Sequence, residues 1–199
     1  MLAAALREHA AVQLVVYADN ATNELGPDFR AMIERTGVNL EVRQRPRTPM
    51  DVLRNAASLV RLSKDFRPDV VHIQEDGRDE LVLALAGLTQ IPVVLTVHDP
   101  APHSGHDAQR YRFSRARLYH KLLRRRADCA ITHGSLIAKE LARVEPRLGV
   151  RAHVIPHGPL GVWNGDAAPS SQLDMPATLL FFGRIHAYKG LSYFVEAVC

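Results

Sequence analysis

Short apolar runs alternate with longer stretches of helical spacing along most of this 199-residue chain. Runs rich in Val, Ile and Leu that are bounded by polar or turn residues are typical of strands. They predict strands over residues 12–18, 38–42, 70–74, 93–97, 129–132 and 152–156. Apolar residues three and four positions apart are typical of helices packed on a sheet. They predict helices over residues 27–35, 50–66, 80–88, 110–127 and 135–144.

The strands at 70–74 and 93–97 are almost continuously apolar, which favours parallel strands covered by helices. Strands that alternate with helices in this way predict a doubly wound, Rossmann-like α/β domain with right-handed crossovers. We assign residues 1–156 to this N-terminal domain. Residues 157–176 are rich in Gly, Pro, Ser, Asn and Asp and are predicted to be a linker. Residues 177–199 are predicted to begin a second domain.

This second domain is represented by one βα unit, with a strand at 178–183 and a helix that runs from 192 to 198. At the other end of the chain, the helix-like residues 1–10 precede the first strand, and the pattern shows no earlier strand. We therefore expect a fragment that lacks the first strand of its first domain and most of its second domain.

Composition narrows the class of protein. The chain is 47% hydrophobic and 23% charged, as in ordinary globular domains, so disorder is excluded. The two cysteines, Cys129 and Cys199, are too few for a disulfide framework, and a cytoplasmic setting is expected. Cys129 lies in an apolar run and is predicted to be buried. Residues 1–10 lack the regions of a signal peptide, and no run approaches the ~20 apolar residues that span a bilayer.

The net charge of +4 comes from one segment. Residues 110–126 hold eight Lys and Arg residues and no acid, so the rest of the chain carries a net −4. Apolar residues share one helical face of this segment, which leaves three interpretations open. It is a helix with a solvated cationic side, an attachment to the inner face of an anionic membrane, or a nucleic-acid contact. No nucleic-acid-binding motif accompanies the charge, so we predict no nucleic-acid partner.

The segment from Gly183 to Gly190 lies between the predicted strand and helix of the second domain. A glycine at a strand end lets the backbone approach a ligand, and free N–H groups at a helix start attract an anion. Arg184 and Lys189 add two positive charges, which together suit a diphosphate. An ordinary loop with two solvated cations fits the same residues, and the spacing alone leaves both interpretations open.

A second candidate site follows the strand at 93–97. His98 and Asp99 stand at its carboxyl end, where open α/β sheets bind ligands. An imidazole there can hydrogen-bond a ligand hydroxyl or a developing charge, and Asp99 can orient the ring or bind hydroxyl groups. A histidine that merely caps the loop is the alternative. His133, at the end of the strand at 129–132, can line the same cleft.

The loop after His98 also carries the residue types of a metal site. The candidate ligands are His98, Asp99, His103, His106 and Asp107. Their spacing matches no motif of fixed geometry, and loop histidines are common without an ion, so we predict no metal.

Several segments resemble one known family. The residues LLFFGRIHAYKGLSYFVEAV resemble the opening of the second domain of retaining glycosyltransferases of family 4, which have the two-domain GT-B fold. The segments PDVVHIQ, IPVVLTVHD and RRRADCAITHGSLIAKEL resemble parts of the first domain of that family. VIPHG resembles an interdomain element that commonly reads VIPNG, with His157 in place of the Asn.

The resemblance implies roles for the candidate residues. Arg184 and Lys189, with Gly183, would hold the diphosphate of a nucleotide-sugar donor, and His98 would contact the donor sugar. The remaining cleft candidates are Asp99, His133 and His157. The implied reaction transfers the sugar, with retention of configuration, to a saccharide or a lipid-linked acceptor, and it needs no metal or other cofactor.

Two other functions are compatible with the same architecture. One is a sugar-nucleotide epimerase or phosphorylase of the GT-B fold, and the other is a non-catalytic basic module that docks on membrane. The acidic segment with which the resembling family contacts the donor would lie beyond residue 199. We therefore expect the 199 residues alone to show no transferase activity.

Overall fold

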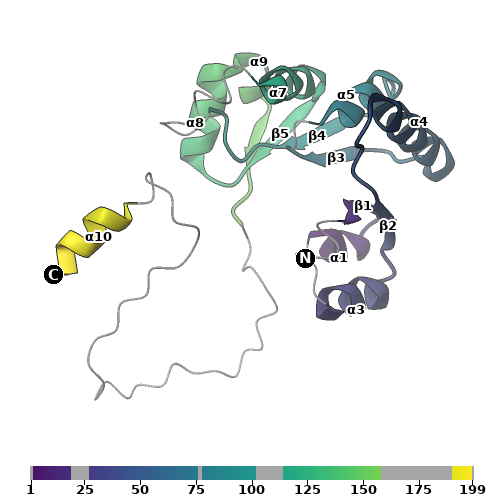
Figure 1. Ribbon diagram of the computed structural model, residues 1–199, viewed down its shortest axis with the longest axis horizontal. Coiled ribbons are helices and arrows are strands. Elements are labelled where there is room, and N and C mark those ends of the chain that lie inside the picture. The colour runs from purple at the N-terminus through teal and green to yellow at the C-terminus, as the bar shows by residue number, and fades with distance from the viewer. Residues whose placement is uncertain (1, 19–26, 76–77, 102–113, 158–189, 199) are drawn as a thin grey trace.

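The computed structural model describes residues 2–18, 27–75, 78–101, 114–157 and 190–198 (Figure 1). Two parallel sheets lie within these ranges, one of two strands and one of four. The strands are β1 (Gln13–Tyr17), β2 (Asn39–Arg43), β3 (Val71–Gln74), β4 (Val93–Thr96), β5 (Cys129–Thr132) and β6 (Ala152–Val154). The helices are α1 (Leu2–Arg7), α3 (Pro27–Thr36), α4 (Pro49–Phe66), α5 (Asp79–Ala86), α7 (Arg115–Arg126), α8 (Ser135–Val144), α9 (Pro146–Gly149) and α10 (Leu191–Val198).

The smaller sheet pairs β1 with β2, and helices α1 and α3 pack against each other beside it (Figure 1). Helix α3 is anchored by Ile33, which is fully buried. It ends before Gly37, whose φ of 68° lies in the left-handed region that glycine adopts without strain. Arg7 on α1 donates from Nε to the Gly37 carbonyl oxygen at 3.1 Å. The helix predicted over residues 27–35 is confirmed, and it ends one residue later, at Thr36.

Helix α4 leads from the smaller sheet to the larger one and packs along α5. Its start is fixed by a capping box, in which Thr48 Oγ1 accepts the Asp51 N–H at 3.2 Å. The Asp51 carboxylate in turn accepts the Thr48 N–H at 3.0 Å. These bonds satisfy amide groups that the first turn of a helix leaves unpaired, so the chain turns sharply into the helix.

The larger sheet has the order β3-β4-β5-β6, with every pair parallel. Because each strand follows its neighbour in sequence, right-handed crossovers place α5, α7 and the α8–α9 pair on the same face. Figure 1 shows α5, α7 and α9 on that side of β4 and β5. The core lies between this face and the helices. Its buried residues are Ile73, Leu85, Val93, Leu95, Val97, Leu123, Ala127, Ala130, Leu141 and Leu148.

The two sheets are joined through the end of β1. Tyr17 donates its hydroxyl to the carboxylate of Glu80 on α5, and the Glu80 residue is only 2% exposed. The guanidinium of Arg78 lies 4.3 Å from the centre of the Tyr17 ring, within the range of a cation–π contact. A buried carboxylate needs such a donor, so this contact links the smaller sheet to the beginning of α5.

The architecture is the predicted Rossmann-like parallel α/β fold, and each predicted strand and helix among the described residues is found within a few residues of its expected bounds. One burial prediction is wrong, because Cys129 is half-buried. It pairs in register with Val94 on the face of the sheet opposite the helices that form the core. The helix predicted near the end of the chain is α10, whereas the predicted strand at 178–183 and residues 158–176 of the predicted linker lie outside the described residues.

Candidate functional site

Three histidines follow the carboxyl ends of three neighbouring strands. His98 comes two residues after β4, His133 directly after β5, and His157 three residues after β6. Parallel strands end at the same edge of the sheet, so these side chains converge. The ring centres are 3.5 Å apart for His133 and His157, 5.2 Å for His98 and His133, and 6.1 Å for His98 and His157. We call this group the histidine cluster.

Hydrogen bonds orient two rings of the cluster. Nε2 of His98 lies 3.2 Å from Oε1 of Gln74, which ends β3. Nδ1 of His133 lies 2.9 Å from the carbonyl oxygen of Ile155. Both oxygens accept hydrogen bonds, so the ring nitrogens that face them carry the hydrogen. In the neutral rings, Nδ1 of His98 and Nε2 of His133 therefore keep a lone pair.

The surroundings of His98 favour its neutral form. Loss of water contacts lowers the pKa of His98 below its ordinary value of 6.5, and the neighbouring His133 and His157 lower it further. The negative charges of Asp99 and Glu75 act in the opposite direction and are the smaller effects. At pH 7 the ring is therefore uncharged and can accept one hydrogen bond while it donates another.

A buried ion pair lies next to the loop that carries His98. Nε of Arg124 is 2.6 Å from Oε1 of Glu75, and the two side chains are 6% and 4% exposed. The same guanidinium donates to the backbone carbonyls of Pro100 at 2.8 Å and Asp99 at 3.2 Å. Helix α7 runs back from the carboxyl edge of the sheet, and helical side chains lean toward the start of their helix, so Arg124 reaches that edge. The pair thereby holds the backbone that follows β4.

Of the other predicted site residues, Asp99 lies within the described ranges and six do not. Asp99 lies at the expected edge with its side chain exposed, and its backbone carbonyl accepts from Arg124. The candidates Gly183, Arg184, Lys189, His103, His106 and Asp107 lie outside the described residues.

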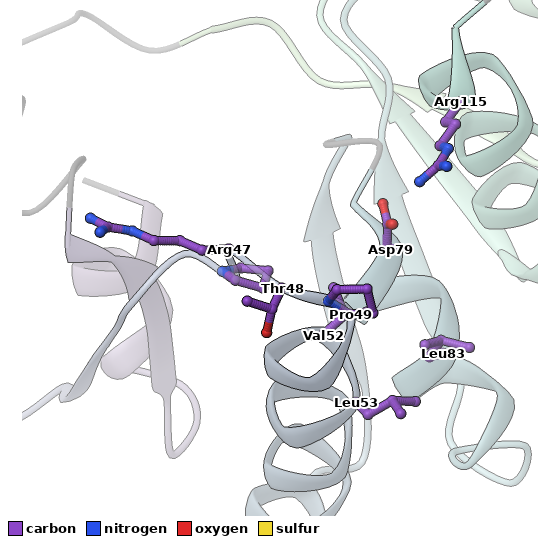
Figure 2. Close-up of a pocket in the computed structure, with 9 residues that line it drawn as sticks. Arg47, Thr48, Pro49, Val52, Leu53, Asp79, Leu83 and Arg115 are labelled. Atoms are coloured by element: carbon purple, nitrogen blue, oxygen red, sulfur yellow. The ribbon is translucent and has the colours of Figure 1, made fainter.

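An open hollow of about 470 Å³ lies where α4, α5 and α7 begin. Figure 2 shows Asp79 and Arg115, the first residues of α5 and α7, pointing toward one another on one side of it. Apolar side chains form the opposite wall, and two of them, Leu53 and Leu83, are 55% and 45% exposed. The hollow therefore combines an apolar wall with charged groups of both signs.

Of the three interpretations open for the basic segment, a helix with a solvated cationic side does not hold at two of its arginines. Arg124 is buried, as described above, and Arg126 is half-buried. Arg126 donates to the carbonyl oxygens of Leu88 at 2.8 Å and Ile91 at 2.7 Å. These acceptors compensate for the water that the cations lose. The exposed cations of α7 are Arg115, Arg117, Lys121 and Arg125. Among the described helices, none is long and apolar enough to cross a membrane.

Three residues that shape the site escaped the sequence analysis: Gln74, Glu75 and Arg124. Gln74 and Glu75 lie at the carboxyl end of β3. His98 became a candidate because it lies at the carboxyl end of a strand, so the same signal could have found these two residues. Arg124 follows the core residue Leu123, but its sequence position resembles that of any surface arginine. Its buried partner could be found only from the folded structure.

Comparison with known proteins identifies the family. Residues 1–158 match the model of the glycosyl transferase 4-like domain, which is most of the chain. The chain belongs to the glycosyl transferase 4-like family. This confirms the resemblance found in the sequence at the level of the family. No curated protein matches the chain.

Two solved structures resemble this glycosyl transferase 4-like chain. One is a protein of Listeria monocytogenes assigned as a UDP-N-acetylglucosamine 2-epimerase, with a TM-score of 0.55, 13% identity, and coverage of 77% of this chain and 40% of that one. The other is a glycosyltransferase of Rickettsia africae, with a TM-score of 0.48, 13% identity, and coverage of 74% and 43%. At this identity the first likeness shows the fold alone. The chain spans about two fifths of the length of both structures.

Proposed function

We propose that this glycosyl transferase 4-like protein transfers a sugar from a nucleotide-diphosphate sugar to a hydroxyl acceptor, with retention of configuration. The observation that carries the proposal is the histidine cluster at the carboxyl edge of the sheet. Open α/β folds bind ligands at that edge, and the cluster places a neutral imidazole there. Family membership makes sugar transfer the reaction class to test first.

His98 is the proposed contact to the donor sugar. Its Nε2–H is held by Gln74, so its Nδ1 is the atom that can accept a hydrogen bond from a sugar hydroxyl. The Arg124–Glu75 pair keeps the backbone beside His98 in one position. A fixed hydrogen-bond partner needs little reorganisation during the reaction, which is the main way that such a group lowers the barrier.

We assign binding of the departing diphosphate to Gly183, Arg184 and Lys189. Negative charge grows on the leaving oxygen as the bond to the sugar breaks, and nearby cations stabilise it. We propose that residues 177–199 belong to the donor-binding domain and that residues 157–176 are the hinge between domains. His157, at the beginning of this hinge, would bring its ring to the sugar side of the cleft together with Asp99 and His133.

The acceptor is assigned to the first domain, residues 1–156. The hollow at the starts of α4, α5 and α7 offers an apolar wall for a lipid or sugar face and charged groups for hydroxyls. Arg115 of α7 lines the hollow, and the exposed cations along α7 support an additional contact with an anionic membrane surface. Binding to vesicles that contain an anionic phospholipid tests this contact. Arg117→Glu should weaken it, whereas Arg124 is buried and is not a useful probe.

The proposal is tested by product analysis with the full product of the reading frame that encodes this chain. The protein is incubated with UDP- and GDP-sugars and an acceptor, and the products are identified by NMR. Transfer with retained anomeric configuration is expected. His98→Ala should lower kcat/KM by about 100-fold, the low end for loss of a positioned catalytic group, and the exposed His153→Ala should leave it unchanged. Epimerised or phosphorolysed donor, or equal transfer by the two variants, would contradict the proposal.

A further inference from the structure

We infer that His98, His133 and His157 form a binding site for a transition-metal ion of the zinc type, with one coordination position open. This goes beyond the proposed function, because sugar transfer as described uses these rings as hydrogen-bond partners and needs no metal. The cluster also differs from the ligand set considered for the loop after β4, since it shares only His98 with it.

The distances within the cluster suit a shared ion. One ring nitrogen from each histidine can be chosen so that all three lie within 4.8 Å of one another. A tetrahedral zinc ion with bonds of 2.0–2.1 Å requires its nitrogen ligands to be about 3.3 Å apart. The ring of His157 is exposed, so rotation about its side-chain bonds can bring its nitrogen closer to those of the other two rings. His133 directly follows β5, and the N–H groups of Val97 and Ile155, one and two residues before His98 and His157, donate to carbonyls of β5, so the three ligands stay near one point.

The hydrogen bonds around the cluster prepare the ligand atoms. A histidine that binds a metal usually donates its second ring N–H to an oxygen, which fixes the ring and its tautomer. His133 has this arrangement with the Ile155 carbonyl, and His98 has it with Oε1 of Gln74. Nε2 of His133 and Nδ1 of His98 are therefore the nitrogens that would face the ion. A group of surface histidines without a ligand role has no need for such oriented partners.

The chemistry of the ligands selects the class of metal. All three are imidazoles, which favour Zn²⁺, Co²⁺, Ni²⁺ and Cu²⁺, whereas Mg²⁺ and Ca²⁺ prefer oxygen ligands. Three protein ligands leave the fourth position of a tetrahedral ion for water or another small ligand. An ion bound here also takes His98 away from a donor sugar, so metal and donor would compete for the same edge of the sheet.

The test uses the untagged 199-residue chain, with Zn²⁺ followed by calorimetry and Co²⁺ followed by its visible absorption. One equivalent of Zn²⁺ is expected to bind, Co²⁺ should give the intense bands of a tetrahedral site, and Mg²⁺ should not compete. His133→Ala and His157→Ala should each weaken Zn²⁺ binding by at least about 10-fold. Gln74→Ala, which removes the partner of His98 and a 3.5 Å bond to Thr96 but no ligand, should weaken Zn²⁺ binding by about 10-fold. His153→Ala, an exposed histidine outside the cluster, should have no effect.

Absence of Zn²⁺ binding to the wild-type chain, or unchanged binding in both cluster variants, overturns the inference. Urea unfolding of each variant establishes that a loss of binding is not a loss of folding, and Gln74→Ala provides a test that leaves every ligand in place. The transfer assay is run with a chelator present. Failure of the metal site then leaves the proposed transferase function standing, and failure of transfer leaves the metal site standing.

Discussion

The two edges of the four-stranded sheet are built differently. At the amino edge, the loops are tied to one another. Asp128 accepts the Val93 N–H at 2.8 Å and donates its own N–H to the Val93 carbonyl, also at 2.8 Å. Arg126 donates to the carbonyls of Leu88 and Ile91, and its second nitrogen lies 3.1 Å from Asp128. These bonds join the segment before β4 to the beginning of β5.

At the carboxyl edge, the polar groups face outward. His98 and His157 are exposed, and a methyl group added at Gly134 would meet nothing within 4 Å. The buried Arg124–Glu75 pair holds the backbone of Asp99 and Pro100 through hydrogen bonds to their carbonyls. The imidazoles of the histidine cluster keep nitrogen lone pairs available. The amino edge of the sheet therefore contributes mainly to stability, whereas the carboxyl edge combines a fixed backbone with accessible side chains.

The largest effect on stability is expected from the Arg124–Glu75 ion pair at the carboxyl edge. Arg124→Met would leave the Glu75 carboxylate buried without its cation, and such a loss costs about 3–5 kcal/mol of unfolding free energy. Arg125→Met, at the exposed neighbouring position, should change stability by less than about 0.5 kcal/mol. Urea unfolding of the two variants measures the difference. Similar losses in both would show that the buried pair does not stabilise this edge.

A smaller effect is expected from close packing at the amino edge. A methyl group at Gly149 in α9 would come within 2.3 Å of the Ala142 Cα in α8, so the two helices would have to separate. Gly149→Ala should therefore cost about 1–3 kcal/mol. The same substitution at Gly134, on the open carboxyl edge, should cost less than about 0.5 kcal/mol. Thermal unfolding compares them, and equal melting temperatures would refute the contrast between the edges.

The smallest effect concerns acid stability at the amino edge. The Val93 N–H, and after it Arg126, hold the pKa of Asp128 below its usual value of 3.8. A carboxylate with a lowered pKa stabilises the folded state above the unfolded pKa, and this contribution is lost as the pH falls through the folded pKa. Asp128→Asn should lower the free energy of unfolding by about 1 kcal/mol at pH 7. Below about pH 4, the stability of this variant should depend less on pH than that of the wild type.

Unfolding of wild type and variant across this pH range provides the measurement. Asp69→Asn, at an exposed position away from these bonds, serves as the control and should follow the wild-type curve. Parallel curves for wild type and Asp128→Asn would show that the bond to Val93 does not carry the acid dependence.

Much of the fold was predictable because its signals are local. A β-branched run such as Val93–Thr96 specifies a strand, and Gly37 marks a helix end through its left-handed backbone. The candidate status of His98 and His133 also came from position, since both stand at strand ends. Cys129 was less predictable, because an apolar run does not reveal which face of the sheet receives helices.

The pairing of distant groups was decided by the tertiary structure. The amino-acid pattern marked His98, His133 and His157 one by one, but only the order β4-β5-β6 brings their rings within 6.1 Å of each other. Likewise, eight cations in one segment appeared equivalent until the fold placed Arg124 against Glu75. Local patterns determine elements because their forces act over a few residues. Burial and ion pairing depend on which strands become neighbours, and that is a property of the whole sheet.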